Sequence, residues 1–100
     1  MTLRRGDNQR EHAEAMGIDA LGFLAAEPER LERFMALAGI DLSTIREVAR
    51  DSAFLAAVLD HLMSDEPLLL AFAANKGVKP EVVVRCAHLL GGGPWERDSA

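Results

Sequence analysis

The sequence has little that would suit a secreted protein and no segment that would span a membrane. Cys86 is the single cysteine, so the chain cannot form an internal disulfide. The first residues do not combine a basic stretch with an apolar core, as a secretion signal requires. The longest wholly apolar run, from Leu68 to Ala74, is far shorter than the roughly 20 residues of a membrane-spanning helix. We therefore expect a cytoplasmic protein with no membrane partner.

The residue types that usually carry chemistry are scattered along the chain. His12, His61, His88 and Cys86 do not cluster, and the last two would point to different sides of a helix. No serine, threonine or cysteine falls in a recognisable motif with a base. The glycine run 91–93 follows a predicted helix instead of opening one, which argues against a phosphate-binding loop. The sequence predicts a protein that is not an enzyme, with no metal site and no cofactor.

Basic residues are outnumbered, with 11 Lys and Arg against 16 Asp and Glu, for a net charge of −5. This balance disfavours a nucleic-acid partner, whose phosphates would be repelled. Of the 100 residues, 49% are hydrophobic, enough for one compact core and too few for two. We expect a loose arm over residues 1–8, one domain over 9–90 and a flexible glycine-rich tail over 91–100 that contains Trp95.

Apolar residues recur at spacings of three and four and do not alternate with polar residues, which predicts an all-α fold. Start and stop signals place about six helices. They fall at about 9–26, at 28–38, around Ile45 to Ala49, at 52–64, from Pro67 to just before Gly77, and from Pro80 to Leu90. Asp51 and Asp65 are the expected caps of the fourth and fifth helices, and either Asp41 or Ser43 caps the third.

The chain resembles itself when it is shifted by 38 positions. Phe34 then coincides with Phe72, and Gly39 with Gly77. A duplication would explain the match, and so would the rhythm that any two helical hairpins share. Either explanation predicts a compact bundle of two similar three-helix units, each with a helix-turn-helix-like hairpin.

One of these hairpins suggests a small DNA-binding protein as an alternative function. The helix after Gly39 offers side chains that could contact bases or phosphates, namely Ser43, Thr44, Arg46 and Arg50. Glu47 lies among them and weakens the basic character of this face. The hairpin pattern describes how two helices pack, and its specificity for DNA is low.

The last two predicted helices favour an interaction or adaptor role, because they carry more apolar side chains than a small monomer can cover. Leu68 and Leu70 are the candidate contacts for an unknown protein partner or for self-association. Trp95 could dock on its own domain or on a partner. A small-ligand carrier is a third class, for which the sequence indicates only apolar lining between the two units.

Three segments together resemble a known family. They are Pro28 to Phe34, Ala53 to Asp60 and Glu66 to Ala73, within a resemblance that spans about Glu14 to Leu90. The sequence is similar there to a family of short bacterial proteins filed as domain of unknown function 3572. The resemblance implies a small all-helical cytoplasmic bacterial protein, and it brings no catalytic or binding residue to carry over.

Overall fold

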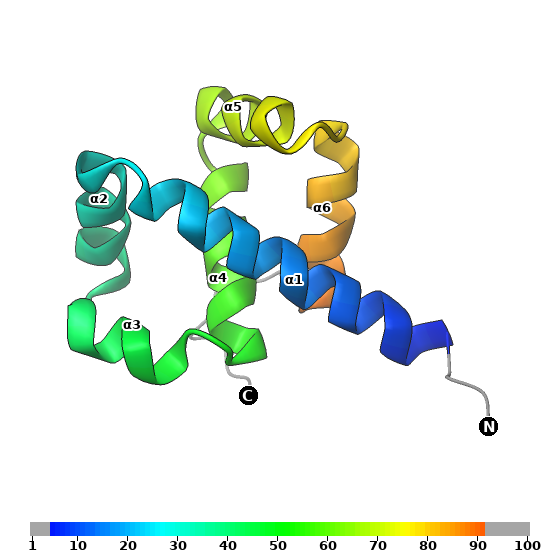
Figure 1. Cartoon of the computed structure of the whole chain (residues 1–100), viewed down its shortest axis with the longest axis horizontal. Helices are drawn as coiled ribbons and strands as arrows, with labels where there is room; N and C mark the ends of the chain where they lie inside the picture. Colours follow the sequence, from blue (N-terminus) through cyan, green and yellow to red (C-terminus); the bar gives the residue numbers. More distant parts are fainter. Residues whose placement is uncertain (1–4, 92–100) are drawn as a thin grey trace.

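A computed structural model describes residues 5–91, with side chains from residue 8 onward. Within this range the chain folds into six α-helices and no strand, which confirms the all-α prediction. The helices are α1 (Arg5–Ala25), α2 (Pro28–Ala38), α3 (Leu42–Val48), α4 (Ser52–Met63), α5 (Glu66–Lys76) and α6 (Pro80–Leu89). In Figure 1, α1 crosses α4 at the centre, with α2 and α3 on one side and α5 and α6 on the other.

Local signals in the sequence set most helix ends. The carboxylates of Asp41, Asp51 and Asp65 each accept a hydrogen bond from a backbone N–H in the first turn of the helix that follows. Asp41, and not Ser43, is therefore the cap of α3. Gly39 and Gly77 end α2 and α5 with φ of 72° and 77°, the left-handed conformation that glycine adopts without strain.

The first helix differs from its expected bounds. It begins at Arg5 instead of near Gln9, so residues 5–8 extend α1 where a loose arm was expected. Adding residues to an existing helix is inexpensive, and this stretch contains no proline to stop it. Residues 1–4 of the expected arm and residues 92–100 of the expected tail lie outside the described residues.

The core is wholly apolar among the described residues, and it is supplied mainly by α1, α4 and α6. Phe54, Phe72, Leu24, Leu55, Leu59 and Leu62 are among its largest fully buried side chains. Burying such a side chain contributes about 1.5–3 kcal/mol relative to leaving it exposed. The centre of the molecule is therefore a packing core, and any binding surface lies around it.

Contacts between the two predicted units pair equivalent positions. Ser52 donates a hydrogen bond to Glu14, and a Cβ placed on Gly17 would lie 2.8 Å from the Cβ of Leu55. In both pairs the partners are 38 residues apart, the shift that superimposes the sequence on itself. Contact between equivalent positions is the signature of a twofold axis. The crossing of α1 over α4 therefore lies on an approximate internal twofold axis.

Candidate functional site

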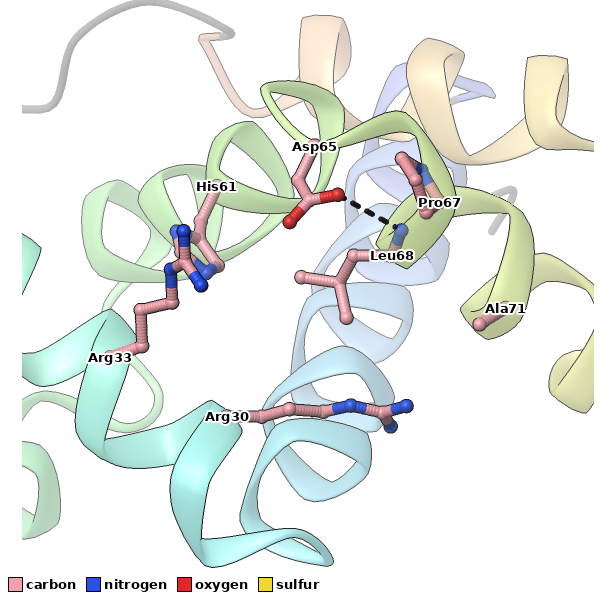
Figure 2. Close-up of a pocket in the computed structure, with 7 residues that line it drawn as sticks. All are labelled: Arg30, Arg33, His61, Asp65, Pro67, Leu68 and Ala71. Carbon is pink, nitrogen blue, oxygen red and sulfur yellow. Dashed lines mark hydrogen bonds between the residues drawn. The ribbon is translucent and has the colours of Figure 1, made fainter.

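A pocket of about 250 Å³ opens where α2, α4 and α5 meet (Figure 2). We call it the two-arginine pocket, and it is lined by Arg30, Arg33, His61, Asp65, Pro67, Leu68 and Ala71. Arg30 and Arg33 lie on successive turns of α2 and line the pocket at different edges, with Arg33 beside His61 and Arg30 at the opposite edge (Figure 2). Pro67, Leu68 and Ala71 come from α5 and form the facing wall. One wall is thus cationic and the other apolar.

The two walls come from equivalent parts of the two units. Shifting Arg30 and Arg33 by 38 positions leads to Leu68 and Ala71, which lie across the pocket from them. The approximate twofold axis at the crossing of α1 and α4 therefore also relates the two walls of the pocket. The sequence predicted only apolar lining between the units, and this was wrong because Arg30 and Arg33 line the pocket.

His61 lies at one edge of the pocket, beside Arg33 (Figure 2). Its ring packs against that of Phe34, with the ring centroids 5.1 Å apart and the planes inclined by 64°. Burial lowers the pKa of His61, the carboxylate of Asp65 opposes the shift, and the positive charge of Arg33 adds to it. The imidazole is therefore neutral at pH 7 and can accept one hydrogen bond and donate another.

The two arginines have no acidic partner among the described residues. The guanidinium of Arg30 lies over the ring of Phe23, 4.7 Å from its centroid, in cation–π geometry. Neither Arg30 nor Arg33 takes part in an ion pair, which within residues 8–91 are formed only by Arg10 with Glu14 and by Lys76 with Asp19. The N–H groups along the edges of both guanidiniums remain available to a ligand.

Among the described residues, Asp65 is the only carboxylate that lines the two-arginine pocket. One of its oxygens accepts the backbone N–H of Leu68 at 3.2 Å, which caps α5. Figure 2 shows this carboxylate on the side of the pocket away from Arg30. The pocket therefore carries two positive charges and one negative charge, against a net charge of −5 for the chain.

Two further hollows adjoin the pocket at His61 and continue along α2 and α4. One, of about 260 Å³, is lined by Phe34, Leu37, Ala38, Ala57, Asp60, His61 and Ser64. The other, of about 440 Å³, is lined by Arg33, Leu37, His61, Ser64, Asp65, Glu66 and Pro67. We call the three hollows together the His61 groove. Burial raises the pKa of Asp60, which lies in the first of them.

Leu37 stands at the edge of this groove and is the most exposed large apolar residue in the described part of the chain. Its exposed fraction is 71%, against 55% for Leu42, 46% for Leu70 and 43% for Ile18. Leu37 faces both hollows beyond the pocket. The sequence does not indicate this exposure, because the spacing of Leu37 from Phe34 is that of an ordinary core position.

The predicted interface residues are placed differently from one another. Leu68 is half-buried against the core and also lines the two-arginine pocket. Leu70 is exposed on α5 and lines none of the three hollows. Trp95 lies outside the described residues. The structure therefore separates Leu68 and Leu70, and of the two only Leu70 offers an outward apolar side chain.

The residues predicted for DNA contact lie on or directly after α3, a helix of seven residues. The hydroxyls of Ser43 and Thr44 both donate to the carboxylate of Asp41, at 3.1 Å and 3.0 Å. Hydrogen bonds from the backbone and hydroxyl of Thr44, and then from Ser43, lower the pKa of Asp41, so the start of α3 carries a negative charge. Arg46 and Arg50 are exposed. A negative charge and two engaged hydroxyls do not favour a phosphate at this helix start.

A second pocket, of about 280 Å³, lies between α1 and α6. It is lined by Asn8, Gln9, His12, Val82, Arg85, Cys86 and Leu89. Burial raises the pKa of the Cys86 thiol, with a smaller opposing effect from Arg85. The sulfur is therefore a thiol at pH 7 and packs as a small apolar group.

The described residues contain neither a metal-binding cluster nor a membrane-spanning helix. No group of three or more His, Cys, Asp or Glu side chains in residues 8–91 is arranged to hold a metal ion. None of the six helices combines the length and the apolar character needed to cross a bilayer.

Comparison with known proteins gives a family and no function. Residues 10–93 match a family described as "Protein of unknown function (DUF3572)". No curated protein and no solved structure matches the chain.

Proposed function

The chain belongs to the DUF3572 family of proteins of unknown function, and we propose that it is a non-catalytic interaction domain. In this proposal the domain works in the bacterial cytoplasm and binds a segment of a partner protein in the His61 groove. Leu37 is the main apolar contact, and Phe34, Ala38 and Ala57 form the floor beside it.

The exposure of Leu37 is the observation that carries the proposal. A leucine that is 71% exposed contributes little to the stability of its own fold, because most of its side chain stays in water. Here it borders a hollow whose floor is apolar. A partner side chain inserted between Leu37 and Ala57 would remove apolar surface from water on both sides.

Leu70 marks a second surface, on α5, that is suited to self-association. It is 46% exposed and lines none of the three hollows of the His61 groove. A weak dimer through this face would leave the groove free. A Leu70→Gln variant is therefore expected to lower any dimer fraction seen by analytical ultracentrifugation without changing the binding of a partner at Leu37.

Site-specific photo-cross-linking in the protein's own host tests the proposal. A photoreactive phenylalanine analogue replaces Leu37 in one variant and Leu70 in another. A third variant carries it at Glu81, which is exposed on α6 and lines none of the three hollows. We expect one protein to cross-link at position 37 and not at position 81. Cross-linking at position 70 is expected to give a second copy of this chain.

The cross-linked protein is then purified and its binding measured directly. Leu37→Gln is expected to weaken binding at least tenfold, since it places a polar group at the centre of the contact, while Glu81→Gln leaves affinity unchanged. Equal cross-linking at positions 37 and 81, or full affinity of the Leu37→Gln variant, would refute the groove as the binding surface. A version that ends at Leu90 shows whether Trp95 contributes to affinity.

A further inference from the structure

The His61 groove is not uniform along its length, and its two-arginine end has a chemistry of its own. Arg30 and Arg33 reach this end without an acidic partner in the described part of the chain. At the other end the groove is bordered by Asp60 and by apolar residues of α2 and α4. A ligand that spans the groove therefore meets positive charge at one end and apolar surface at the other.

The guanidinium of Arg30 is held in place before any ligand arrives. Its position over the Phe23 ring, 4.7 Å from the centroid, occupies one face of the guanidinium plane and leaves the N–H edges free. Arg33, on the next turn of α2, is exposed and lies beside His61. The two guanidiniums lie at different edges of the pocket (Figure 2), so a carboxylate between them would meet a planar donor on either side.

The opposite wall of the pocket favours an apolar group next to the bound carboxylate. Pro67, Leu68 and Ala71 present apolar atoms, and the Asp65 carboxylate is engaged by the Leu68 N–H. Asp65 would repel a doubly charged phosphate more strongly than a singly charged carboxylate. An acidic group next to aliphatic carbons fits both walls.

We infer that the two-arginine pocket anchors a glutamate or aspartate side chain of the partner segment, with an aliphatic neighbour against Leu68 and Ala71. This inference rests on the proposed function. The acidic residue sets the direction in which the segment lies in the groove, because only one end of the groove offers paired arginines. Leu37 then contacts the part of the segment further along.

The test uses the full chain labelled with ¹⁵N and small probes that can be compared directly. Isovalerate carries one carboxylate on a branched aliphatic chain, and its amide has the same shape without the charge. We expect isovalerate to shift the backbone resonances of Leu68 and Ala71 in a saturable way, with a Kd on the order of 1 mM for so small a ligand. The amide is expected to give no saturable shift, and inorganic phosphate to bind more weakly than isovalerate.

Three variants locate the site. Arg33→Gln and Arg30→Gln are each expected to weaken isovalerate binding at least fivefold. Arg85→Gln removes an exposed arginine from the pocket between α1 and α6, and it is expected to bind like the wild type. Thermal unfolding confirms that each variant is folded, so that a loss of binding is assigned to the side chain.

The outcomes separate this inference from the proposed function. Equal shifts with isovalerate and its amide, or equal losses in Arg33→Gln and Arg85→Gln, would overturn the carboxylate site while cross-linking at position 37 could still support the groove. Phosphate binding tighter than isovalerate would also overturn it. Saturable isovalerate binding together with no cross-link at position 37 would refute the proposed function. It would still support the carboxylate preference of the pocket.

Discussion

The ring of His61 packs on Phe34 as the ring of Phe23 packs on Phe72. The ring centroids are 5.1 Å apart in the first pair and 5.3 Å apart in the second, and the planes are inclined by 64° and 59°. A shift of 38 positions converts one pair into the other, with His61 taking the place of Phe23. Each pair joins one unit to the other. The same contact is therefore made twice, once with a titratable ring.

Replacing that ring gives a first prediction. His61→Phe restores the equivalent aromatic pair and is expected to raise the free energy of unfolding at pH 7 by about 1 kcal/mol, through added apolar burial. Urea denaturation measures this. His61→Ala serves as the contrast, because it removes the ring and is expected to destabilise the protein.

The pH dependence of stability follows from the same residue. Burial lowers the pKa of His61 in the folded protein below its ordinary value of 6.5, so the unfolded chain binds more protons near and below that pH. The stability from His61 is present above pH 6.5 and is lost as pH falls through the folded pKa. Between pH 7.5 and 5.5 the wild type should lose stability that His61→Phe retains. Parallel pH profiles for the two proteins would contradict this assignment.

Two glycines of α1 form a matched pair for a test of the helix crossing. Gly17→Ala brings a Cβ to within 2.8 Å of the Leu55 Cβ, so α1 and α4 must separate. Overpacking of about 1–3 kcal/mol should outweigh the gain of about 1 kcal/mol in helix propensity. Gly22→Ala meets nothing within 4 Å and should stabilise by about 0.5–1 kcal/mol. Chemical denaturation of both variants checks the opposite signs, and a shift in the same direction would disprove close contact at Gly17.

The two equivalent helix ends should respond alike to substitution. Gly39→Ala and Gly77→Ala each force a side chain into the left-handed conformation, at φ of 72° and 77°. Each is expected to lower the free energy of unfolding by about 1 kcal/mol, and asparagine should cost less at either site. Thermal unfolding of the four variants measures this. An alanine variant as stable as the wild type would mean that the helix end rearranges.

The thiol of Cys86 is expected to be unreactive in the folded protein, because burial raises its pKa and shields the sulfur. Reaction with a colorimetric disulfide reagent at pH 7.5 should be on the order of 100-fold slower than in denaturant. A variant with a cysteine in place of Ala74, which is exposed on α5, provides the reactive reference. Equal rates for the two cysteines would show that α6 opens readily.

The helix ends were predictable because their causes are local. Asp51 and Asp65 cap the helices that directly follow them, and Gly39 and Gly77 end helices within one turn. The early start of α1 was missed because a polar stretch such as residues 5–8 has no apolar stripe to signal helix. There the helix continues beyond the part of the chain that a side-chain pattern indicates.

The two-arginine pocket was missed for a different reason. The sequence places Arg30 and Arg33 among glutamates, where a solvated helix face was the natural interpretation. Their role depends on how α2 faces α5, which no local pattern records. The internal shift of 38 could have indicated it, since residues equivalent to each other meet across a twofold axis, and Arg30 and Leu68 are such a pair. Leu37 could not be found in this way, because its spacing from Phe34 is that of an ordinary core position.

The approximate twofold axis has a consequence for what the pocket can distinguish. Two identical chains around such an axis would place the same side chain on both walls, so a bound segment could lie equally well in either of two opposite directions. A single chain that contains both units is free of that constraint. Arg30 and Arg33 line one wall, and their equivalents on the other wall are Leu68 and Ala71. Because the two units are joined in one chain and differ in sequence, the two walls of the pocket differ, and a bound segment can be held in a single direction.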